Sequence, residues 1–332
     1  MKTYLITGGA GFIGSHFIEE ILNRGDSRVV NLDKLTYAGS LDKLVFAKGN
    51  QDYIFKKGDI CDGTVVDELF ETYDFDYVVN FAAESHVDRS IKDVAPFLQT
   101  NVIGVRVLLD AIKKHWKGQS GKFFLQISTD EVYGSLDEGV FADEEFPLKP
   151  GNPYSASKAA ADLLVMSYYH TYGLPVMITR CCNNFGQRQY KEKFIPLMID
   201  RLVNGRQIPL YGEGTNKREW IHIKEHCRIL SGVLENGLPG EIYNIGSGFI
   251  RRNIDVAMYI IKVFNEAAGM NLSDTSISYV SDRVGHDLRY ALNYLKVSKL
   301  VRMDESPDFQ DKLRGLVLWN LKTYGQGQSV EK

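Results

Sequence analysis

A glycine-rich segment near the N-terminus constrains the fold of this chain more than any other feature. Residues 4–6 form an apolar run, the segment TGGAGFIG follows at once, and the helical pattern SHFIEEILNRG comes next. Glycines at positions 8, 11 and 14 allow a tight turn, a close approach of backbone to a pyrophosphate, and close packing of a helix on a strand. The N-terminus of the helix favours phosphate charge. The sequence therefore predicts a strand–loop–helix unit of the dinucleotide-binding type.

The second predicted strand, residues 28–32, ends in an acidic residue at the expected distance from the loop. Asp33 lies close to ~20 residues beyond the glycines, where a carboxylate can accept hydrogen bonds from an adenosine ribose. The same carboxylate would repel a 2′-phosphate, which favours NAD over NADP. Lys34 weakens this preference slightly, and a merely solvated strand end is the alternative reading of Asp33.

Strands and helices continue to alternate up to Gly186. Residues 53–57, 77–81 and 123–127 read as strands, and residues 64–73, 102–116 and 152–172 read as helices. This alternation predicts an α/β fold, a Rossmann-type doubly wound parallel sheet with ligands at the C-terminal strand ends. Small residues at Ala82-Ala83 and the loop at Asp59-Ile60 are placed to border the dinucleotide.

The later part of the chain is expected to form a smaller, mostly α-helical substrate-binding cap. Residues 194–204, 253–268 and 306–324 read as helices, and residues 241–245 read as a strand that returns to the main sheet. We therefore expect an NAD-binding domain of residues 1–186 plus about 222–250. The substrate-binding domain then comprises about 187–221 and 251–325, and residues 326–332 form a flexible tail.

Bulk properties narrow the class of protein. The net charge of −3 does not indicate a nucleic-acid binder, and the four cysteines have no CxxC spacing, which favours reduced thiols in a cytoplasmic protein. No apolar run approaches the roughly 20 residues needed to span a bilayer, and no set of residues has metal-ligand spacing. Broad apolar coverage of the helices near 101–117 and 153–172 favours a homodimer through them, although burial against the chain's own sheet is the alternative.

Two pairs of residues carry the chemistry. Tyr154 and Lys158 are four apart and share a helix face, where an ammonium is expected to lower the pKa of the phenol, so that it can take a hydroxyl proton as hydride leaves. Asp130 and Glu131 end the strand before this helix, and two neighbouring carboxylates in a closed site provide one general acid and one general base. Thr129 can hydrogen-bond the hydroxyl that is oxidised.

Seven segments together resemble one family of enzymes. TGGAGFIG, DKLTYAG, FAAESHVDRS, STDEVYG, NPYSASKA, RCCNNFG and DRVGHDLRYA are similar to the dTDP-glucose 4,6-dehydratases of the extended short-chain dehydrogenase/reductase group, over about residues 3–325. The resemblance implies that tightly bound NAD accepts the C4 hydride of the sugar and later returns it to C6. It implies that Tyr154 takes the C4 hydroxyl proton, Glu131 the C5 proton, and that Asp130 protonates the departing C6 hydroxyl. The product is a 4-keto-6-deoxy sugar nucleotide, as in deoxysugar biosynthesis.

The resemblance also implies the binding residues. The expected cofactor contacts are Gly8, Gly11, Phe12, Ile13, Gly14, Asp33, Lys34, Leu35, Thr36, Asp59, Ile60, Ala82, Ala83, Thr100, Tyr154, Lys158 and Asn184. The expected substrate contacts are Ser85, Thr129, Asn183, Lys193, Phe194, Pro209, Tyr211, Arg218, Asn253, Arg283 and His286.

One segment departs from the family pattern. The family usually has a Pro-Tyr type segment after NNFG, whereas residues 187–191 read QRQYK here. We expect this loop to lie near the substrate. The choice between a thymidine and a uridine nucleotide in the substrate therefore stays open. A UDP-glucose 4,6-dehydratase, a 4-epimerase or a UDP-glucuronate decarboxylase is the alternative function. The last two do not usually carry the Asp-Glu pair.

Overall fold

A seven-stranded parallel sheet forms the centre of the larger lobe in the computed structural model, which describes residues 1–303 and 308–327. The strand order is β10-β6-β5-β4-β1-β2-β3, so the direction of strand succession reverses beside β1, where ligands bind in folds of this kind. The predicted doubly wound parallel sheet is confirmed. Its strands are β1 (Lys2–Thr7), β2 (Ser27–Asp33), β3 (Tyr53–Lys57), β4 (Tyr77–Asn80), β5 (Phe123–Thr129), β6 (Val176–Cys181) and β10 (Ile242–Ile245).

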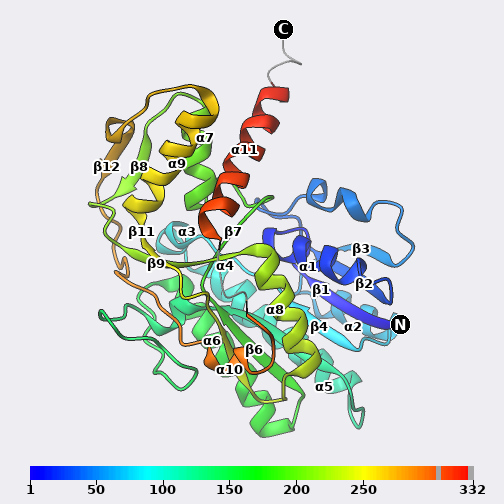
Figure 1. Cartoon of the computed structure of the whole chain (residues 1–332). Coiled ribbons are helices and arrows are strands. Elements are labelled where there is room, and N and C mark those ends of the chain that lie inside the picture. Colours follow the sequence, from blue (N-terminus) through cyan, green and yellow to red (C-terminus); the bar gives the residue numbers. More distant parts are fainter. Residues whose placement is uncertain (304–307, 328–332) are drawn as a thin grey trace.

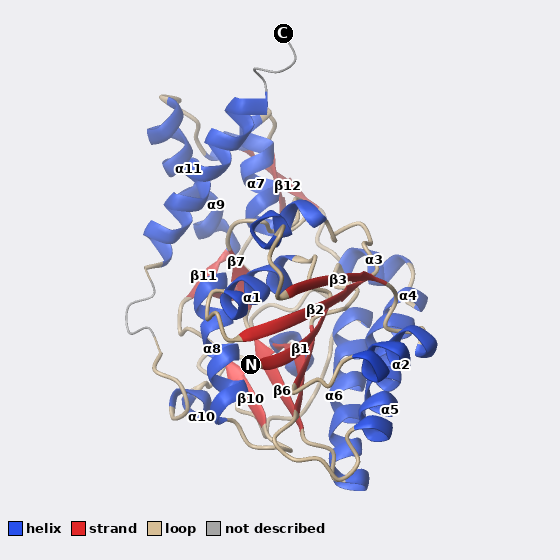
Figure 2. Cartoon of the chain, turned by 90° about the vertical axis from the view of Figure 1, so that its right-hand side faces the viewer, coloured by secondary structure: helices blue, strands red, loops and turns tan. Residues whose placement is uncertain are grey.

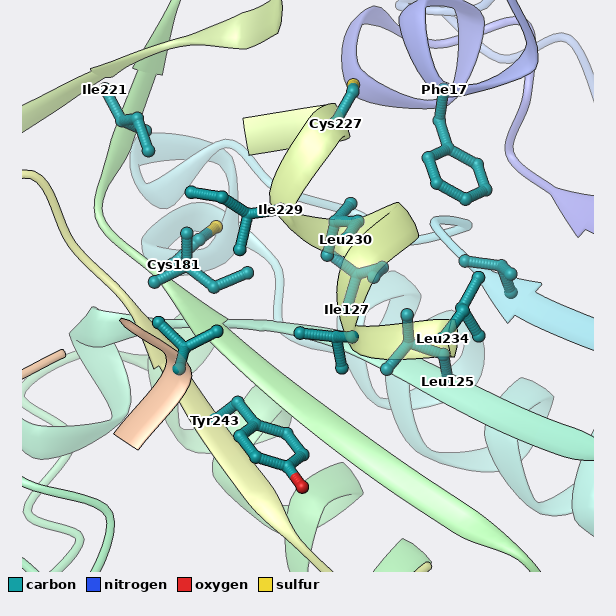
Figure 3. Packing of buried hydrophobic residues seen from close by; sticks show 14 of the residues in the cluster. Phe17, Leu125, Ile127, Cys181, Ile221, Cys227, Ile229, Leu230, Leu234 and Tyr243 are labelled. Carbon is teal, nitrogen blue, oxygen red and sulfur yellow. The ribbon is translucent and has the colours of Figure 1, made fainter. Parts of the chain in front are cut away.

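Helices cover both faces of this sheet (Figure 2). Neighbouring residues of a strand point to opposite faces, so Ile6 packs with α1 and α8 while Leu5 packs with α2, α5 and α6. Figure 3 shows one of these faces, where Leu230 and Leu234 of α8 lie beside Leu125 and Ile127 of β5. The helices of this lobe are α1 (Phe12–Leu22), α2 (Gly63–Thr72), α3 (Val87–Lys92), α4 (Ala95–Leu98), α5 (Val105–His115), α6 (Pro153–Tyr172), α8 (Ile223–Asn236) and α10 (Leu295–Ser298), with short turns η1 (Leu41–Ala47) and η3 (Asp130–Tyr133).

The smaller lobe consists of helices and short strands that lie together to one side of the main sheet (Figure 1), and it has its own apolar core. This core joins α7 (Phe194–Val203), α9 (Asn253–Ala268) and α11 (Phe309–Gly327) to the parallel pair β8 (Ile208–Tyr211) and β12 (Ile277–Val280), and η4 (Asp274–Ser276) precedes β12. A three-stranded sheet, β11-β9-β7, is formed by β7 (Asn183–Phe185), β9 (Lys217–His222) and β11 (Ile250–Arg252). Helix α11 runs two residues into the expected tail, and residues 328–332 and Ser306 lie outside the described residues.

The helix predicted over 102–116 begins earlier and contains an irregular turn. The continuous helical stretch Ala95–His115 includes the π-helical turn η2 (Gln99–Gly104), and such turns are frequent at functional sites. The side chain of Asn101 in this turn accepts from the backbone nitrogen of Glu84 and donates to its carbonyl oxygen. It also donates to Ser157 Oγ of α6 at 2.9 Å. By length and composition Ala95–His115 could also cross a membrane, contrary to our expectation, although half of its most apolar window is buried inside the protein.

Candidate active site

A cleft of about 300 Å³ lies at the C-terminal ends of the parallel strands. It extends from the glycine loop past β4 to the end of β5 and the start of α6. Of the predicted cofactor residues, all except Leu35 line it, namely Gly8, Gly11, Phe12, Ile13, Gly14, Asp33, Lys34, Thr36, Asp59, Ile60, Ala82, Ala83, Thr100, Tyr154, Lys158 and Asn184. Of the predicted substrate residues, Ser85, Thr129, Asn183 and Lys193 line the same cleft.

The glycine loop fits a dinucleotide for steric reasons. A Cβ atom at Gly8 would lie 2.6 Å from the backbone nitrogen of Ala82, and Gly8 has a φ of +70°, which favours glycine. A Cβ atom at Gly14 would lie 2.5 Å from the carbonyl oxygen of Gly8, so only glycine lets α1 approach the loop this closely. Gly11 caps α1 without a side chain, which leaves the first backbone N–H groups of the helix to bind phosphate.

Asp33 lies at the part of the cleft where a ribose is expected. Its carboxylate accepts from the backbone nitrogens of Ala10 at 2.8 Å and Leu35 at 2.7 Å, and burial raises its pKa. Leu35 adopts a φ of +57°, so its backbone forms the turn while its side chain stays out of the cleft lining. Lys34 is paired with Asp59 at 2.5 Å. This pairing neutralises Lys34, the cation whose position in the sequence weakened the preference for NAD.

Tyr154 and Lys158 lie on the first two turns of α6, whose N-terminus is fixed by a capping box of Asn152 and Ser155. The Lys158 ammonium donates to the carbonyl oxygen of Ile127 at 2.6 Å. Both side chains are buried. The prediction that Lys158 lowers the pKa of Tyr154 is wrong for this structure. Burial raises that pKa well above its usual value, and the charge of Glu131 raises it further.

The two acids occupy the turn η3 directly after β5. Thr129 caps this turn by accepting from the backbone nitrogen of Glu131 at 3.3 Å, and its hydroxyl donates to Asp130 Oδ1 at 3.2 Å. Asp130 is buried, and its Oδ2 has no partner among the described residues. Burial first, and then the charges of Glu131 and Glu219, raise the pKa of Asp130 well above its usual value. The raised pKa favours the protonated form of Asp130, which suits this residue to act as an acid.

Seven of the predicted substrate residues do not line the cleft. Tyr211, Arg283 and His286 form a cluster beyond it: the rings of Tyr211 and His286 are 5.9 Å apart, and burial lowers the pKa of His286. Arg218 is buried against the Tyr290 ring and donates to the carbonyl oxygen of Asp287 at 2.9 Å. The others are Phe194, which stacks on Trp220, Pro209 in β8, and Asn253 at the start of α9, whose Oδ1 is buried without a described partner.

Two carboxylates near these groups were missed by sequence reasoning. Asp88 faces the cluster, since its Oδ2 accepts from the Tyr211 hydroxyl at 3.3 Å and its Oδ1 lies 3.7 Å from Arg283 Nη1. Glu219 is fully buried beside the acid pair and accepts from the backbone nitrogens of residues 247, 248 and 292. Asp88 lies inside the segment FAAESHVDRS, but no spacing in the sequence relates it to Tyr211 or Arg283.

The departing loop borders the cleft that also holds four of the predicted substrate residues, and it reaches the cofactor-binding lobe as well. Gln189 and Tyr190 line the cleft, but Arg188 contacts α1 and η1, at the cofactor end, rather than the predicted substrate residues.

Among residues 1–303 and 308–327, no group of histidine, cysteine and acidic side chains could hold a metal ion.

Comparisons with known proteins agree over nearly the whole chain. Residues 5–313 match the family model described as GDP-mannose 4,6 dehydratase. A dTDP-glucose 4,6-dehydratase of Xanthomonas campestris is 44% identical over 337 residues, covering 98% of this chain and 96% of the relative. The low-salt glycan biosynthesis protein Agl12 of Haloferax volcanii is 49% identical over 313 residues, covering 94% and 96%. DesIV, a dTDP-glucose 4,6-dehydratase of Streptomyces venezuelae solved with NAD bound, superposes with a TM-score of 0.89 at 42% identity, covering 98% of each chain.

Proposed function

The chain belongs to the GDP-mannose 4,6 dehydratase family, and on this premise we propose that it is an NAD-dependent dTDP-glucose 4,6-dehydratase. The observation that carries the proposal is the meeting of Tyr154 and Lys158 with Asp130 and Glu131 on one cleft. The first pair suits oxidation of a secondary alcohol, and the second suits removal of water. An epimerase or a decarboxylase needs only the first pair.

NAD fits the cofactor end of the cleft because the glycine loop, the open N-terminus of α1 and the Asp33 carboxylate meet there. When bound, NAD accepts the C4 hydride of the sugar and returns it to C6. Tyr154 receives the C4 hydroxyl proton, and Lys158 supports the phenolate. A phenolate must be present before this proton can be received. Because burial raises the pKa of Tyr154, the phenolate would need the positive charges of Lys158 and of the oxidised nicotinamide near it.

The 4-ketone makes the C5 proton acidic, and Glu131 removes it. Asp130 gives its proton to the C6 hydroxyl, which leaves as water, and a double bond forms between C5 and C6. The raised pKa of Asp130 supports this role, since a donor must still hold its proton at neutral pH. After hydride reaches C6, a proton returns to C5, and the product is the 4-keto-6-deoxy sugar nucleotide.

The sugar diphosphate is proposed to lie between the two lobes. Arg218, Arg283 and His286 are proposed to face its phosphates, with Asn183, Lys193 and Tyr211 as further contacts. In the structure Tyr211 and Arg283 contact the carboxylate of Asp88, which supports their ability to bind an anionic group. We assign the sheet, residues 1–186 and about 222–250, to the cofactor, and about 187–221 and 251–325 to the substrate.

The active protein is proposed to be a cytoplasmic homodimer through the helices near 101–117 and 153–172. Large apolar side chains on and beside these helices are exposed in the single chain, which supports a covered face. They are Ile91, Val94, Leu98, Ile103, Leu163 and Tyr172.

The proposal is tested by incubating the protein with dTDP-glucose and UDP-glucose and weighing the products by mass spectrometry. Loss of one water from dTDP-glucose, without net consumption of NAD, is the expected result. A preference for UDP-glucose would reassign the nucleotide, and an unchanged mass for both would refute a dehydratase. With Glu131→Gln, reduced cofactor should accumulate, because oxidation at C4 precedes the step that needs this base.

A further inference from the structure

The segment between β7 and α7, residues 187–192, crosses the cofactor end of the cleft. Gln189 and Tyr190 line the cleft together with the glycine loop and Asp33. Gln189 is held by a hydrogen bond from its Nε2 to the carbonyl oxygen of Asn184 at 2.9 Å. The segment therefore forms part of the wall between the dinucleotide site and the outside.

Arg188 ties this segment to the cofactor-binding lobe. Its guanidinium donates to the carbonyl oxygen of Lys43 at 3.0 Å and to His16 Nδ1 at 2.7 Å, and it forms an ion pair with Glu19. It also lies 5.2 Å above the ring of Phe46. These partners belong to α1, which follows the glycine loop, and to η1, which follows the ribose-binding turn.

His16 connects the same guanidinium to the backbone of the segment. Its Nε2 is 2.9 Å from the carbonyl oxygen of Gln187 and must carry the hydrogen, so its Nδ1 is left to accept from Arg188. This arrangement requires a neutral ring, and burial lowers the pKa of His16 to about 4. The contact is thus complete at neutral pH.

The far end of the segment is tied to α3. Glu192 accepts two hydrogen bonds from Arg89 at 2.9 and 3.0 Å. The guanidinium of Arg89 stacks on the ring of Tyr37 at 3.7 Å, and Tyr190 packs edge-on against that ring at 5.4 Å. Residues 187–192 are therefore anchored near both of their ends.

The backbone at Arg188 indicates that its side chain determines this conformation. Arg188 has a φ of +66°, which is unfavourable for a residue with a Cβ atom. Such a conformation persists only where surrounding contacts fix it. The guanidinium supplies the contacts that Arg188 itself makes, and hydrogen bonds of Gln187 and Gln189 hold the backbone on either side.

We propose that Arg188 is a clasp residue that holds residues 187–192 closed over the bound dinucleotide and so retains NAD between catalytic cycles. This inference rests on the proposed function, in which NAD is regenerated in each cycle and has no need to leave. Opening of the clasp then limits the rate at which NAD is exchanged.

The test measures exchange of bound NAD in the purified protein, with no sugar present. Protein loaded with radiolabelled NAD is diluted into excess unlabelled NAD, and the label that stays bound is followed over time. Arg188→Gly removes the guanidinium and also relieves the unfavourable φ, so backbone strain cannot account for its effect. Arg188→Lys keeps a side chain at this position and so tests whether the added backbone freedom of glycine is the cause. Arg314→Ala, which removes an exposed arginine paired with Glu266 in the smaller lobe, is the matched control.

We expect Arg188→Gly to release NAD at least about tenfold faster than the wild type, because hydrogen bonds to a charged group are lost, and Arg314→Ala to leave the rate unchanged. Arg188→Lys keeps the positive charge but not the forked guanidinium, and its rate of NAD release should lie between those of the wild type and Arg188→Gly. Equal release by wild type and Arg188→Gly would refute the clasp while leaving the dehydratase assignment intact. A wild-type protein that binds no NAD would instead refute the proposed function itself.

Discussion

A buried ion pair joins the helix that carries Tyr154 and Lys158 to the central sheet, and removing one partner should be costly. Arg180 of β6 donates through Nε to Asp162 Oδ2 of α6 at 2.9 Å, with the two side chains 4% and 1% exposed. Arg180 also donates to the Tyr133 hydroxyl at 2.9 Å. Asp162→Leu would leave the guanidinium buried without a charge partner.

The expected loss of stability follows from this burial. Removing one partner of a buried pair costs about 3–5 kcal/mol, because the remaining charge stays desolvated. For 332 residues the entropy of unfolding is about 0.7 kcal/mol/K, so the unfolding temperature should fall by about 4–7 °C. The change also reaches the active site. Burial lowers the pKa of Lys158 and the charge of Asp162 opposes this, so Asp162→Leu should lower that pKa further and move the loss of activity at high pH to lower pH.

The assay is thermal unfolding of the wild type, Asp162→Leu and the double variant Asp162→Leu/Arg180→Met, each saturated with NAD. The double variant replaces both charges by apolar groups and should recover most of the lost stability. The reasoning would be refuted if Asp162→Leu unfolded at the wild-type temperature, or if the double variant were less stable than the single one.

Three further predictions follow from single positions. Tyr154→Phe should slow the first hydride transfer by about 10²–10⁴-fold, so single-turnover absorbance should show no accumulation of reduced cofactor; rapid accumulation would contradict the role of Tyr154. Gly14→Ala should lower the amount of NAD bound to the purified protein, and it should lower the free energy of unfolding by about 1–3 kcal/mol, because its Cβ would collide with the Gly8 carbonyl oxygen. A variant that is fully loaded with NAD and equally stable would argue against that contact. His226 is buried with a pKa of about 3, below its unfolded value of about 6.5, so its stabilising effect is complete above pH 6.5 and is lost as pH falls toward 3. In urea unfolding, the free energy of unfolding of the wild type should therefore be about 2 kcal/mol lower at pH 5 than at pH 7.5, and His226→Leu should abolish this difference. An equal pH dependence of the wild type and the variant would contradict this reasoning.

Sequence reasoning reached the parts of the site that depend on local spacing. The glycine loop and Asp33 belong to one strand–helix–strand unit, and Tyr154 and Lys158 to one helix, so short-range geometry brings each set together. Asp130 was found for the same reason, since it directly ends a buried strand.

The remainder depends on contacts between distant segments. Arg188 meets His16 across 172 positions of the chain, and Glu219 reaches the acid pair from a strand of another sheet. No periodicity encodes such contacts. The pKa of Tyr154 was mispredicted because a four-residue spacing indicates proximity to Lys158 but not how deeply the phenol is buried.

The position of β10 bears on how this protein could be rebuilt. This strand comes late in the chain, yet it forms the edge of the main sheet beside β6, and α8 before it covers one face. A fragment ending after β7 would expose β6 as a long unpaired apolar edge, which invites aggregation. The cofactor-binding half is therefore not a transferable module. A chimaera that exchanges the sugar-binding part with a relative must keep residues 223–245 with the N-terminal half and be joined at several points.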